Sequence, residues 1–241
     1  METYCLKNKN CLITGATGGV GKEVSIQLAD QSCNLFLTGR NKKKLESLKK
    51  LLIKNNPDIN IEYKEGDLTR LSDIKNIVTN AKHHFGNIDI LINCAGIFMI
   101  KSIRKSTVED FDKSINLNVR APFILSREFS KDMVSKKWGR IVLIGSSSSY
   151  SGFENGSVYC ASKHSVLGLS RALNIELKKK NVRVLCISPS STKTDMGKIS
   201  TDQDFNTFLN PKEVAEYVIF VLSFDNEMSI DESRLNRMIM K

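Results

Sequence analysis

The chain has 241 residues, of which 41% are hydrophobic and 26% are charged. A domain of this length buries roughly 70 to 75% of the surface that its unfolded chain exposes, so one sizeable core is possible. No segment contains the run of about 18 apolar residues that a membrane helix needs, and no apolar signal-peptide stretch opens the sequence. We therefore expect residues 1–241 to form a single, soluble, cytoplasmic domain without a membrane partner.

The formal net charge is +10. The basic residues stand in separate short clusters, such as Lys42–Lys44 and Lys178–Lys180, which is typical of solvated helix faces and ends. Basic and aromatic residues do not interleave as they do in nucleic-acid modules, so we exclude nucleic-acid binding as the main function. An anionic cofactor or an acidic carrier protein would still suit this charge.

The six cysteines show no short paired spacing, and four of them fall in or beside apolar runs. We expect reduced, mostly buried thiols. His83 and His84 are adjacent and His164 stands alone, which is not a ligand spacing, so we predict no metal site. The cysteines are Cys5, Cys11, Cys33, Cys94, Cys160 and Cys186.

Short apolar runs alternate with helix-length segments along the chain. The runs that we expect to be strands are Asn10–Thr14, Asn34–Thr38, Asn60–Tyr63, Ile88–Asn93, Arg140–Ile144 and Val182–Ile187. The expected helices are Gly19–Asp30, Lys42–Lys54, Leu71–His84, Val108–Val134 and Val158–Lys179, the fourth with a kink at Pro122. This alternation predicts an α/β fold with a Rossmann-type, doubly wound parallel sheet.

A glycine-rich turn follows the first predicted strand. Gly15, Gly19 and Gly21 open the first helix, where bare backbone amides and the helix dipole can receive a pyrophosphate. A tight connection without a ligand is the alternative. A P-loop is excluded, because it needs Gly where Ala16 stands and Ser or Thr where Glu23 stands.

Tyr159 and Lys163 are four residues apart in a predicted helix, which puts their side chains on one face. A nearby cation lowers the pKa of a phenol, ordinarily about 10, and makes it a usable acid or base near neutral pH. The pair therefore indicates redox chemistry at a carbonyl. A packed ring beside a solvated amine has the same spacing, so the pair alone leaves both interpretations open.

Two short segments extend the pattern. Gly66-Asp67-Leu68-Thr69 follows the third predicted strand, and Asn93-Cys94-Ala95-Gly96 ends the fourth. With the turn from Thr14 to Gly21, they resemble the cofactor motifs of the short-chain dehydrogenase/reductase family: its Thr-Gly-x-x-x-Gly-x-Gly turn, its adenine-side acid and its Asn-Asn-Ala-Gly. Cys94 departs from this last motif.

The second half of the chain is similar to the same family, and in particular to 3-oxoacyl-[acyl-carrier-protein] reductases. Asn118 matches the family's helix asparagine, and Ser146 precedes Tyr159 at the spacing of its catalytic serine. Thr194-Asp195-Met196 fits the cofactor-binding stretch after the sixth strand, although Pro189-Ser190 replaces the usual Pro-Gly.

The resemblance implies a hydride transfer between a nicotinamide and a ketone or secondary alcohol. Tyr159 would protonate the developing alkoxide, Lys163 would lower the pKa of Tyr159 and bind the ribose, Ser146 would position the substrate oxygen, and Asn118 would hold a water. The implied cofactor-binding residues are Gly15, Thr17, Gly18, Gly19, Val20, Gly21, Arg40, Asp67, Leu68, Asn93, Ala95, Gly96, Tyr159, Lys163, Pro189, Thr192 and Thr194.

The end of the second predicted strand indicates which nicotinamide cofactor is used. NAD-preferring sites place an acid there to bind the ribose 2′-hydroxyl, but this chain has Gly39 followed by Arg40. Arg40 can bind a 2′-phosphate, with Lys43 as a second contact, so we expect NADP(H). The alternative is that Arg40 is only a surface charge at a helix entry.

The substrate is left open by the sequence. A small-molecule or carrier-bound carbonyl compound is expected, first a 3-oxoacyl thioester, with sugars, polyols and other ketones as alternatives. The residues expected to select it are Ile97, Phe98, Met99, Gly152–Asn155 and a lid over Gly197–Phe208. A non-catalytic NADP-binding regulator remains an alternative, whereas a serine hydrolase is disfavoured because Gly168-Leu169-Ser170-Arg171-Ala172 lies inside a predicted helix.

The resemblance covers about Asn10 to Leu222, and the end of the chain departs from it. The Gly-rich close of many family members is missing, and only Ser229–Leu235 could form a final strand. The long helices from Val108 and Val158 carry more apolar positions than one sheet face needs. We therefore expect a homodimer or a homotetramer.

Overall fold

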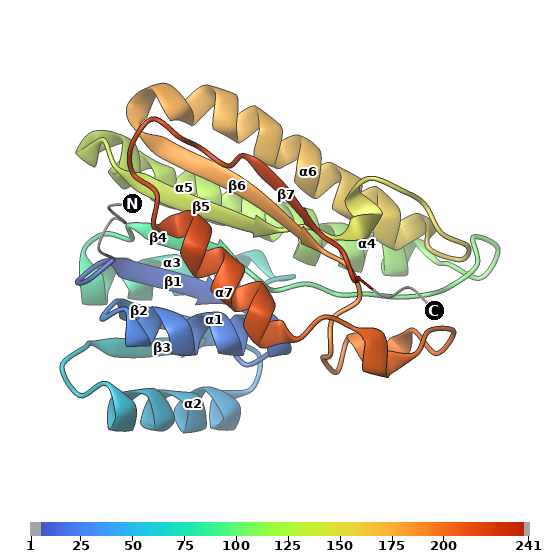
Figure 1. The fold of residues 1–241 in the computed structure, drawn as a ribbon, viewed down its shortest axis with the longest axis horizontal. Helices are drawn as coiled ribbons and strands as arrows, with labels where there is room; N and C mark the ends of the chain where they lie inside the picture. The colour runs from blue at the N-terminus through green and yellow to red at the C-terminus, as the bar shows by residue number, and fades with distance from the viewer. Residues whose placement is uncertain (1–5, 239–241) are drawn as a thin grey trace.

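The computed structural model describes residues 6–238, which contain one sheet of seven parallel strands in the order β3-β2-β1-β4-β5-β6-β7 (Figure 1). The doubly wound parallel fold predicted from the sequence is confirmed. The strands are β1 Asn10–Thr14, β2 Asn34–Gly39, β3 Ile61–Glu65, β4 Ile90–Asn93, β5 Gly139–Ile144, β6 Val182–Pro189 and β7 Glu232–Leu235.

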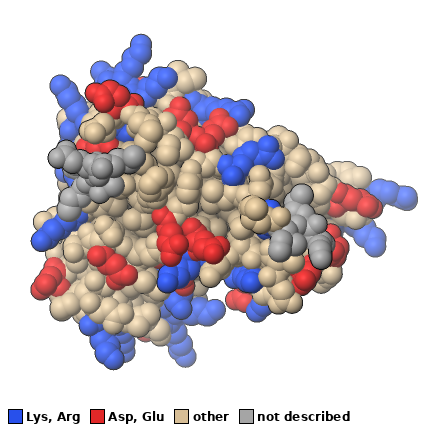
Figure 2. All heavy atoms as spheres, in the orientation of Figure 1, with Lys and Arg blue, Asp and Glu red and all other residues tan. Residues whose placement is uncertain are grey.

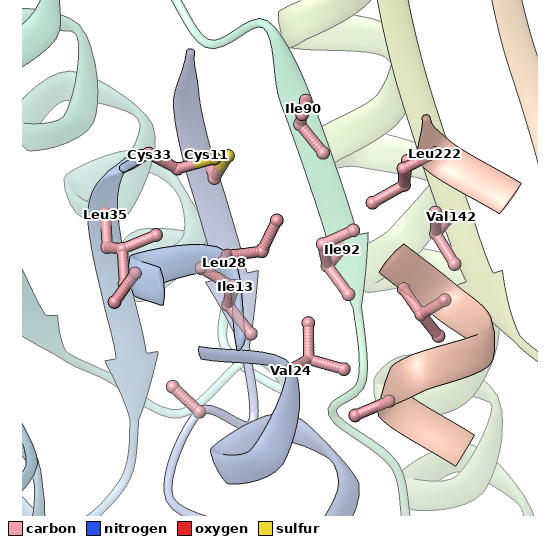
Figure 3. Packing of buried hydrophobic residues seen from close by; sticks show 14 of the residues in the cluster. Cys11, Ile13, Val24, Leu28, Cys33, Leu35, Ile90, Ile92, Val142 and Leu222 are labelled. Carbon is pink, nitrogen blue, oxygen red and sulfur yellow. The ribbon is translucent and has the colours of Figure 1, made fainter. Parts of the chain in front are cut away.

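Helices cover both faces of the sheet, which is why the strands are apolar on both sides. Within β1, Cys11 and Ile13 pack into one core and Leu12 into the other. The helices α1 Gly19–Asp30, α2 Lys42–Asn55 and α7 Pro211–Leu222 complete the first core, part of which Figure 3 shows. The helices α3 Leu71–Phe85, α5 Ala121–Lys136 and α6 Ser157–Leu177 complete the second.

The long helix expected from Val108 to Val134 is interrupted. It consists of α4 Val108–Ile115, a π-helical turn η1 Asn116–Arg120, and α5. Pro122 lies in the first turn of α5 and does not kink the middle of a helix. It has no amide hydrogen, so it cannot donate the hydrogen bond that the Asn118 carbonyl would accept in an α-helix. Such π turns often occur at functional sites, and this one carries Asn118.

Two further differences lie near the carboxyl terminus. The sequence did not indicate α7, whose apolar positions Ala215, Val218 and Val221 pack on the sheet. The final strand begins at Glu232 rather than at Ser229 and pairs parallel to β6, with Ser188 opposite Arg234. This pairing brings the last described residues to the carboxyl ends of the strands.

The chain reverses its direction of winding between β1 and β4, which are neighbours in the sheet. In open parallel sheets a crevice forms at this point, outside the carboxyl ends of the strands. The Thr14 hydroxyl accepts a hydrogen bond from the Ala95 amide at 3.0 Å, so the loops that follow β1 and β4 are held together there. The candidate site lies along this edge.

Five of the cysteines lie in the described part of the chain, and all five are free thiols; Cys5 lies outside the described residues. On the face drawn in Figure 2, lysine and arginine side chains stand in separate groups among acidic and neutral surface. Within residues 6–238 no helix is both long and apolar enough to cross a bilayer. In the same residues no group of three His, Cys, Asp or Glu side chains is arranged to hold a metal ion.

Candidate active site

A cavity of about 930 Å³ runs along the carboxyl ends of the strands. It is lined by every predicted site residue except Asn93 and Asn118. These lining residues are Gly15, Thr17, Gly18, Gly19, Val20, Gly21, Arg40, Asp67, Leu68, Ala95, Gly96, Ser146, Tyr159, Lys163, Pro189, Thr192 and Thr194. Residues distant in sequence therefore form one wall.

The glycine turn is shaped by close contacts that exclude side chains. Gly15 has a φ of +63°, and a Cβ there would lie 2.9 Å from the backbone of Ala95. At Gly19 a Cβ would lie 2.2 Å from Cγ2 of Thr194, in the segment after β6. At Gly21 it would lie 2.3 Å from the Gly15 carbonyl oxygen. Glycine is thus required for the turn to pack against β4 and the segment after β6.

The start of α1 forms part of the cavity wall, and this end of the helix suits an anion. Gly18 is the N-cap, so no side chain caps the first amides, and no acidic residue lies in the first turn. The first backbone N–H groups of a helix and its dipole favour negative charge. Thr17 and Val20 complete the cavity wall around this turn. The cradle fits the pyrophosphate of a dinucleotide.

At the β2 end of the cavity the charges are mainly basic. Arg40 and Lys44 both line it, and no carboxylate occupies the position of Gly39. Lys43, the expected second cation, lines a smaller neighbouring cavity of about 480 Å³ instead. Asn41 caps α2, and its side chain accepts a hydrogen bond from the Lys44 amide at 3.0 Å. Lys44 therefore lies in the first turn of α2, and it lines the main cavity.

Asp67 lies beyond the end of β3. Burial would raise the pKa of Asp67, but hydrogen bonds from the Thr69 amide (2.9 Å) and hydroxyl (2.8 Å), with help from Arg40, hold it below its usual value. Asp67 is therefore a fixed carboxylate acceptor at neutral pH. Leu68 is buried next to it and gives the cavity an apolar surface.

Ser146 and Tyr159 meet in the middle of the cavity. Ser146 follows β5 and accepts a hydrogen bond from the Ser148 amide at 3.1 Å, which fixes its side chain. Both side chains line the cavity. Burial raises the pKa of Tyr159 to about 12, and the Ser146 hydroxyl acts in the opposite direction. The phenol is therefore protonated at neutral pH.

Lys163 lies one turn after Tyr159 on α6, as the spacing predicted. Its Nζ donates to the Ile144 carbonyl at 2.8 Å and is 5.8 Å from the centre of the Tyr159 ring. Burial lowers the pKa of Lys163 to about 8. The expectation that Lys163 lowers the pKa of Tyr159 is not met in this structure, because loss of hydration dominates at the buried phenol.

Asn118 has a different place from the one expected. Its side-chain oxygen accepts from the Ile97 amide at 2.8 Å, and its amide group donates to the Ile97 carbonyl at 3.0 Å and to Ser162 Oγ at 2.9 Å. The side chain is thus engaged by protein groups. It joins the loop after β4 to α6, and so positions Gly96 against Lys163.

Asn93 is likewise not part of the cavity wall. It is the last residue of β4, is 3% exposed, and donates to the Val142 carbonyl of β5 at 3.4 Å. The residues that follow the end of the strand, Cys94 to Gly96, line the cavity instead.

The cavity also contains residues that were expected to select the substrate. Phe98 packs edge-on against Tyr159 with ring centres 4.7 Å apart, and Phe153 lies 6.1 Å from Phe98. The cavity is lined by Ile97, Phe98, Gly152 and Phe153 and by Gly197, Ser200, Asp202 and Gln203 of the expected lid, but not by Met99, Glu154 or Asn155. Lining residues that the sequence did not indicate include Ile100, Arg234 and Arg237.

Known proteins share these features. The family model described as short chain dehydrogenase matches residues 9–204. An uncharacterized oxidoreductase of Staphylococcus saprophyticus is 30% identical over 227 residues, covering 94% of this chain and 96% of that protein. A 3-oxoacyl-[acyl-carrier-protein] reductase of Rickettsia conorii is 33% identical over 227 residues, 90% of each chain.

Among solved structures, a short-chain dehydrogenase from Sphingobium yanoikuyae in complex with NADPH is 29% identical. The match covers 95% of this chain and 87% of that one, with a TM-score of 0.82. The family match over most of the chain agrees with the glycine turn, and with Ser146, Tyr159 and Lys163 lining one cavity. The chain therefore belongs to the short-chain dehydrogenase family of oxidoreductases.

Proposed function

We propose that this protein transfers hydride between NADP(H) and a ketone or secondary alcohol. One observation carries the proposal: Ser146, Tyr159 and Lys163 line the same cavity as the glycine turn, with Lys163 one helical turn after Tyr159. A cavity that joins an anion-binding helix end to a buried proton donor suits a nucleotide-dependent reduction of a carbonyl.

NADP(H) is the cofactor that these residues fit. The Gly15–Gly21 turn would hold the pyrophosphate, and Arg40 with Lys44 would hold the 2′-phosphate. The NADPH bound to the Sphingobium yanoikuyae relative supports this assignment. Asp67 would accept a hydrogen bond from the adenine, and Thr192 and Thr194 lie where the segment after β6 meets the turn.

The residues of this chain supply the proton and the orientation, while a bound nicotinamide supplies or accepts the hydride. Tyr159 is a neutral phenol at physiological pH and can give its proton to the carbonyl oxygen as negative charge develops there. Ser146 offers a second hydroxyl to that oxygen. The Lys163 side chain is a cation below about pH 8, and it can bind ribose hydroxyls.

The substrate that we propose first is a 3-oxoacyl thioester on a carrier or coenzyme A. It is supported by the reductase from Rickettsia conorii, to which the chain is 33% identical. Another ketone, sugar or polyol is the alternative. A non-catalytic NADP-binding regulator is a second alternative; it has little need for Ser146, Tyr159 and Lys163 in contact with one cavity.

We also propose that residues 1–241 act as one cytoplasmic catalytic domain and assemble at least as a homodimer. Val108 and Phe111 on α4 and Phe123 on α5 expose 71%, 45% and 45% of their surface. Exposed apolar side chains of this size are a common feature of protein interfaces. A second copy of the chain would cover them.

The proposal is tested by following NADPH consumption with a panel of 3-oxoacyl thioesters, keto sugars, quinones and simple ketones. We expect oxidation of NADPH with at least one ketone, and an oxidation roughly 100- to 10,000-fold slower when Tyr159 is replaced by Phe. Tight binding of NADPH without turnover of any ketone or oxidation of any alcohol would favour the regulator instead.

A further inference from the structure

The cavity continues past Tyr159 to the other edge of the sheet, where two arginines line it. Arg234 belongs to β7 and Arg237 follows that strand. The sheet order puts β7 at one edge and β3, next to β2 and Arg40, at the other. These two arginines are thus separate from the basic residues that would hold the 2′-phosphate.

Neither arginine is neutralised by a carboxylate. Among residues 6–238 no Asp or Glu oxygen lies within 4.0 Å of a nitrogen of Arg234 or Arg237. Arg234 is exposed, and its guanidinium lies 4.5 Å from the centre of the Tyr150 ring, a distance that allows a cation–π contact. The neighbouring acid, Glu232, is paired with Arg171 instead.

Arg237 is fixed more firmly. Its two terminal nitrogens donate to Thr207 Oγ1 at 3.0 Å and to Gln203 Oε1 at 2.9 Å, and its guanidinium lies 5.1 Å from the centre of the Phe208 ring. Its Nε is buried and has no hydrogen-bond partner in the described chain. Uncharged acceptors hold the group in place but leave its charge unbalanced, which is an arrangement that suits an incoming anion.

Apolar side chains line part of the cavity that contains Tyr159 and these arginines: Phe98, which packs against the Tyr159 ring, with Phe153, Ile100 and Met196. They form an apolar stretch, while Ser151, Ser190 and Ser191 add small polar groups to the lining. Besides Asp67, the acids that line the cavity are Asp195, which pairs with Lys198 at 2.9 Å, and the exposed Asp202. A substrate in this cavity therefore meets an apolar stretch, two cations and one unpaired carboxylate.

We infer that the carbonyl substrate carries an anionic group, a carboxylate or a phosphate, which Arg234 and Arg237 receive at the end of the cavity opposite Arg40. The inference rests on the proposed reductase function and defines the substrate class of the same site. The apolar stretch would bind the segment between the carbonyl and the anion. The enzyme would then select its substrate by the anionic group, which the arginines bind, and by the planar or aliphatic segment, which the apolar stretch binds.

The test compares charged compounds with uncharged counterparts of similar shape. The pairs are acetoacetate with its methyl ester, 4-acetylbenzoate with its methyl ester, and acetoacetyl 4′-phosphopantetheine with acetoacetyl pantetheine. Dissociation constants are measured by calorimetry with and without NADP⁺. At least one charged member should bind about tenfold or more tightly than its counterpart, the gain expected from one charge-assisted hydrogen bond. The acid pairs indicate a carboxylate, and the thioester pair a phosphate.

The variants separate charge recognition from structure. Arg234→Gln together with Arg237→Gln should bring the ratio of the two dissociation constants close to one while leaving the uncharged member unchanged. Arg127→Gln on α5, which also removes one charge but lies outside the cavity, should leave the ratio intact. Asp202→Asn should increase the ratio. A purely structural effect of Arg237 on the Gln203–Phe208 segment would weaken both members equally.

The inference is overturned if no charged compound binds more tightly than its counterpart, or if the double variant keeps the preference. Because binding is measured independently of turnover, failure of the reductase proposal is a separate result: it would appear as no NADPH oxidation with any ketone. Oxidation of NADPH with uncharged ketones alone would uphold the reductase and reject the anionic substrate.

Discussion

Nζ of Lys163 lies 5.8 Å from the centre of the Tyr159 ring, and both side chains are 7% exposed. Burial disfavours the charged form of each group, so it raises the pKa of Tyr159 to about 12 and lowers that of Lys163 to about 8. At neutral pH the site therefore combines a neutral phenol with an ammonium group. This is the protonation state that carbonyl reduction requires.

Replacing Tyr159 by Phe removes the proton donor and keeps the ring that packs against Phe98. Turnover should fall by roughly 100- to 10,000-fold, the span expected for a lost general acid, while NADPH affinity stays the same. Steady-state kinetics and a fluorescence titration with NADPH measure the two quantities. Near-normal turnover of the variant with a verified substrate would refute the assignment of Tyr159.

The rate should depend on pH through Lys163. Below about pH 8 the amine is charged and can bind the ribose; above it the charge is lost, since the pKa of Lys163 is lowered to about 8. The kcat/KM for NADPH should then be level below pH 8 and fall about tenfold per pH unit above it, because this parameter reports groups of the free enzyme. Lys163→Met should weaken both turnover and cofactor affinity and abolish the fall of kcat/KM above pH 8. If the fall persisted in this variant, it would belong to the titration of another group.

Arg40→Ala should cost about 10- to 100-fold in NADPH affinity, since a hydrogen bond to a charged group contributes about 1.5 to 3 kcal/mol. NADH affinity should hardly change, because NADH has no 2′-phosphate. Lys44→Ala should act in the same direction as Arg40→Ala. Lys43→Ala is the matched control, since Lys43 lines the neighbouring cavity and not this one.

Gly39→Asp should reverse the preference between the cofactors. The new carboxylate would repel the phosphate of NADPH and accept hydrogen bonds from the ribose hydroxyls of NADH. The preference is tested by measuring the dissociation constants of NADPH and NADH for the parent protein and for the variants. Equal losses of both cofactors in Arg40→Ala would mean that Arg40 is structural and not selective.

Light scattering at micromolar concentration should give at least twice the mass of one chain. Phe123→Asp places a charge in the exposed apolar group on α4 and α5 and should shift the protein towards monomer, because a buried, unpaired charge is costly. Leu71→Asp is the control: Leu71 is 56% exposed but lies on α3. A monomeric parent protein would contradict the proposed dimer.

Features with a local physical cause could be predicted from the sequence. Strands covered on both faces are continuous apolar runs, so all six of those predicted were found, with ends shifted by a few residues. The helical repeat put Tyr159 and Lys163 on one face without knowledge of the rest of the fold. The glycine turn was recognisable because close contacts, with backbone at Gly15 and Gly21 and with the Thr194 side chain at Gly19, leave no room for a Cβ.

Features that depend on distant partners could not be predicted in this way. The Asn118 side chain is engaged by Ile97 and Ser162, which are 21 and 44 residues away, so its role follows from the packing of α6 on the loop after β4. Arg234 reaches the cavity because β7 pairs with β6 in a register that sets it opposite Ser188. The raised pKa of Tyr159 is also a tertiary effect, since it results from burial.

The contact between β1 and β4 has a consequence for folding. Asn10 at the start of β1 bonds to Asp89, 79 residues further along the chain, and Thr14 at its end bonds to Ala95, 81 residues further. Closing so long a loop costs conformational entropy before the contacts that it brings together can stabilise the fold. The seam, which is the contact between β1 and β4, should therefore form late, after β1–β3 and β4–β6 have each begun to assemble. The nucleotide cradle lies across the seam, and a refolding chain should therefore acquire cofactor affinity only when its two halves dock.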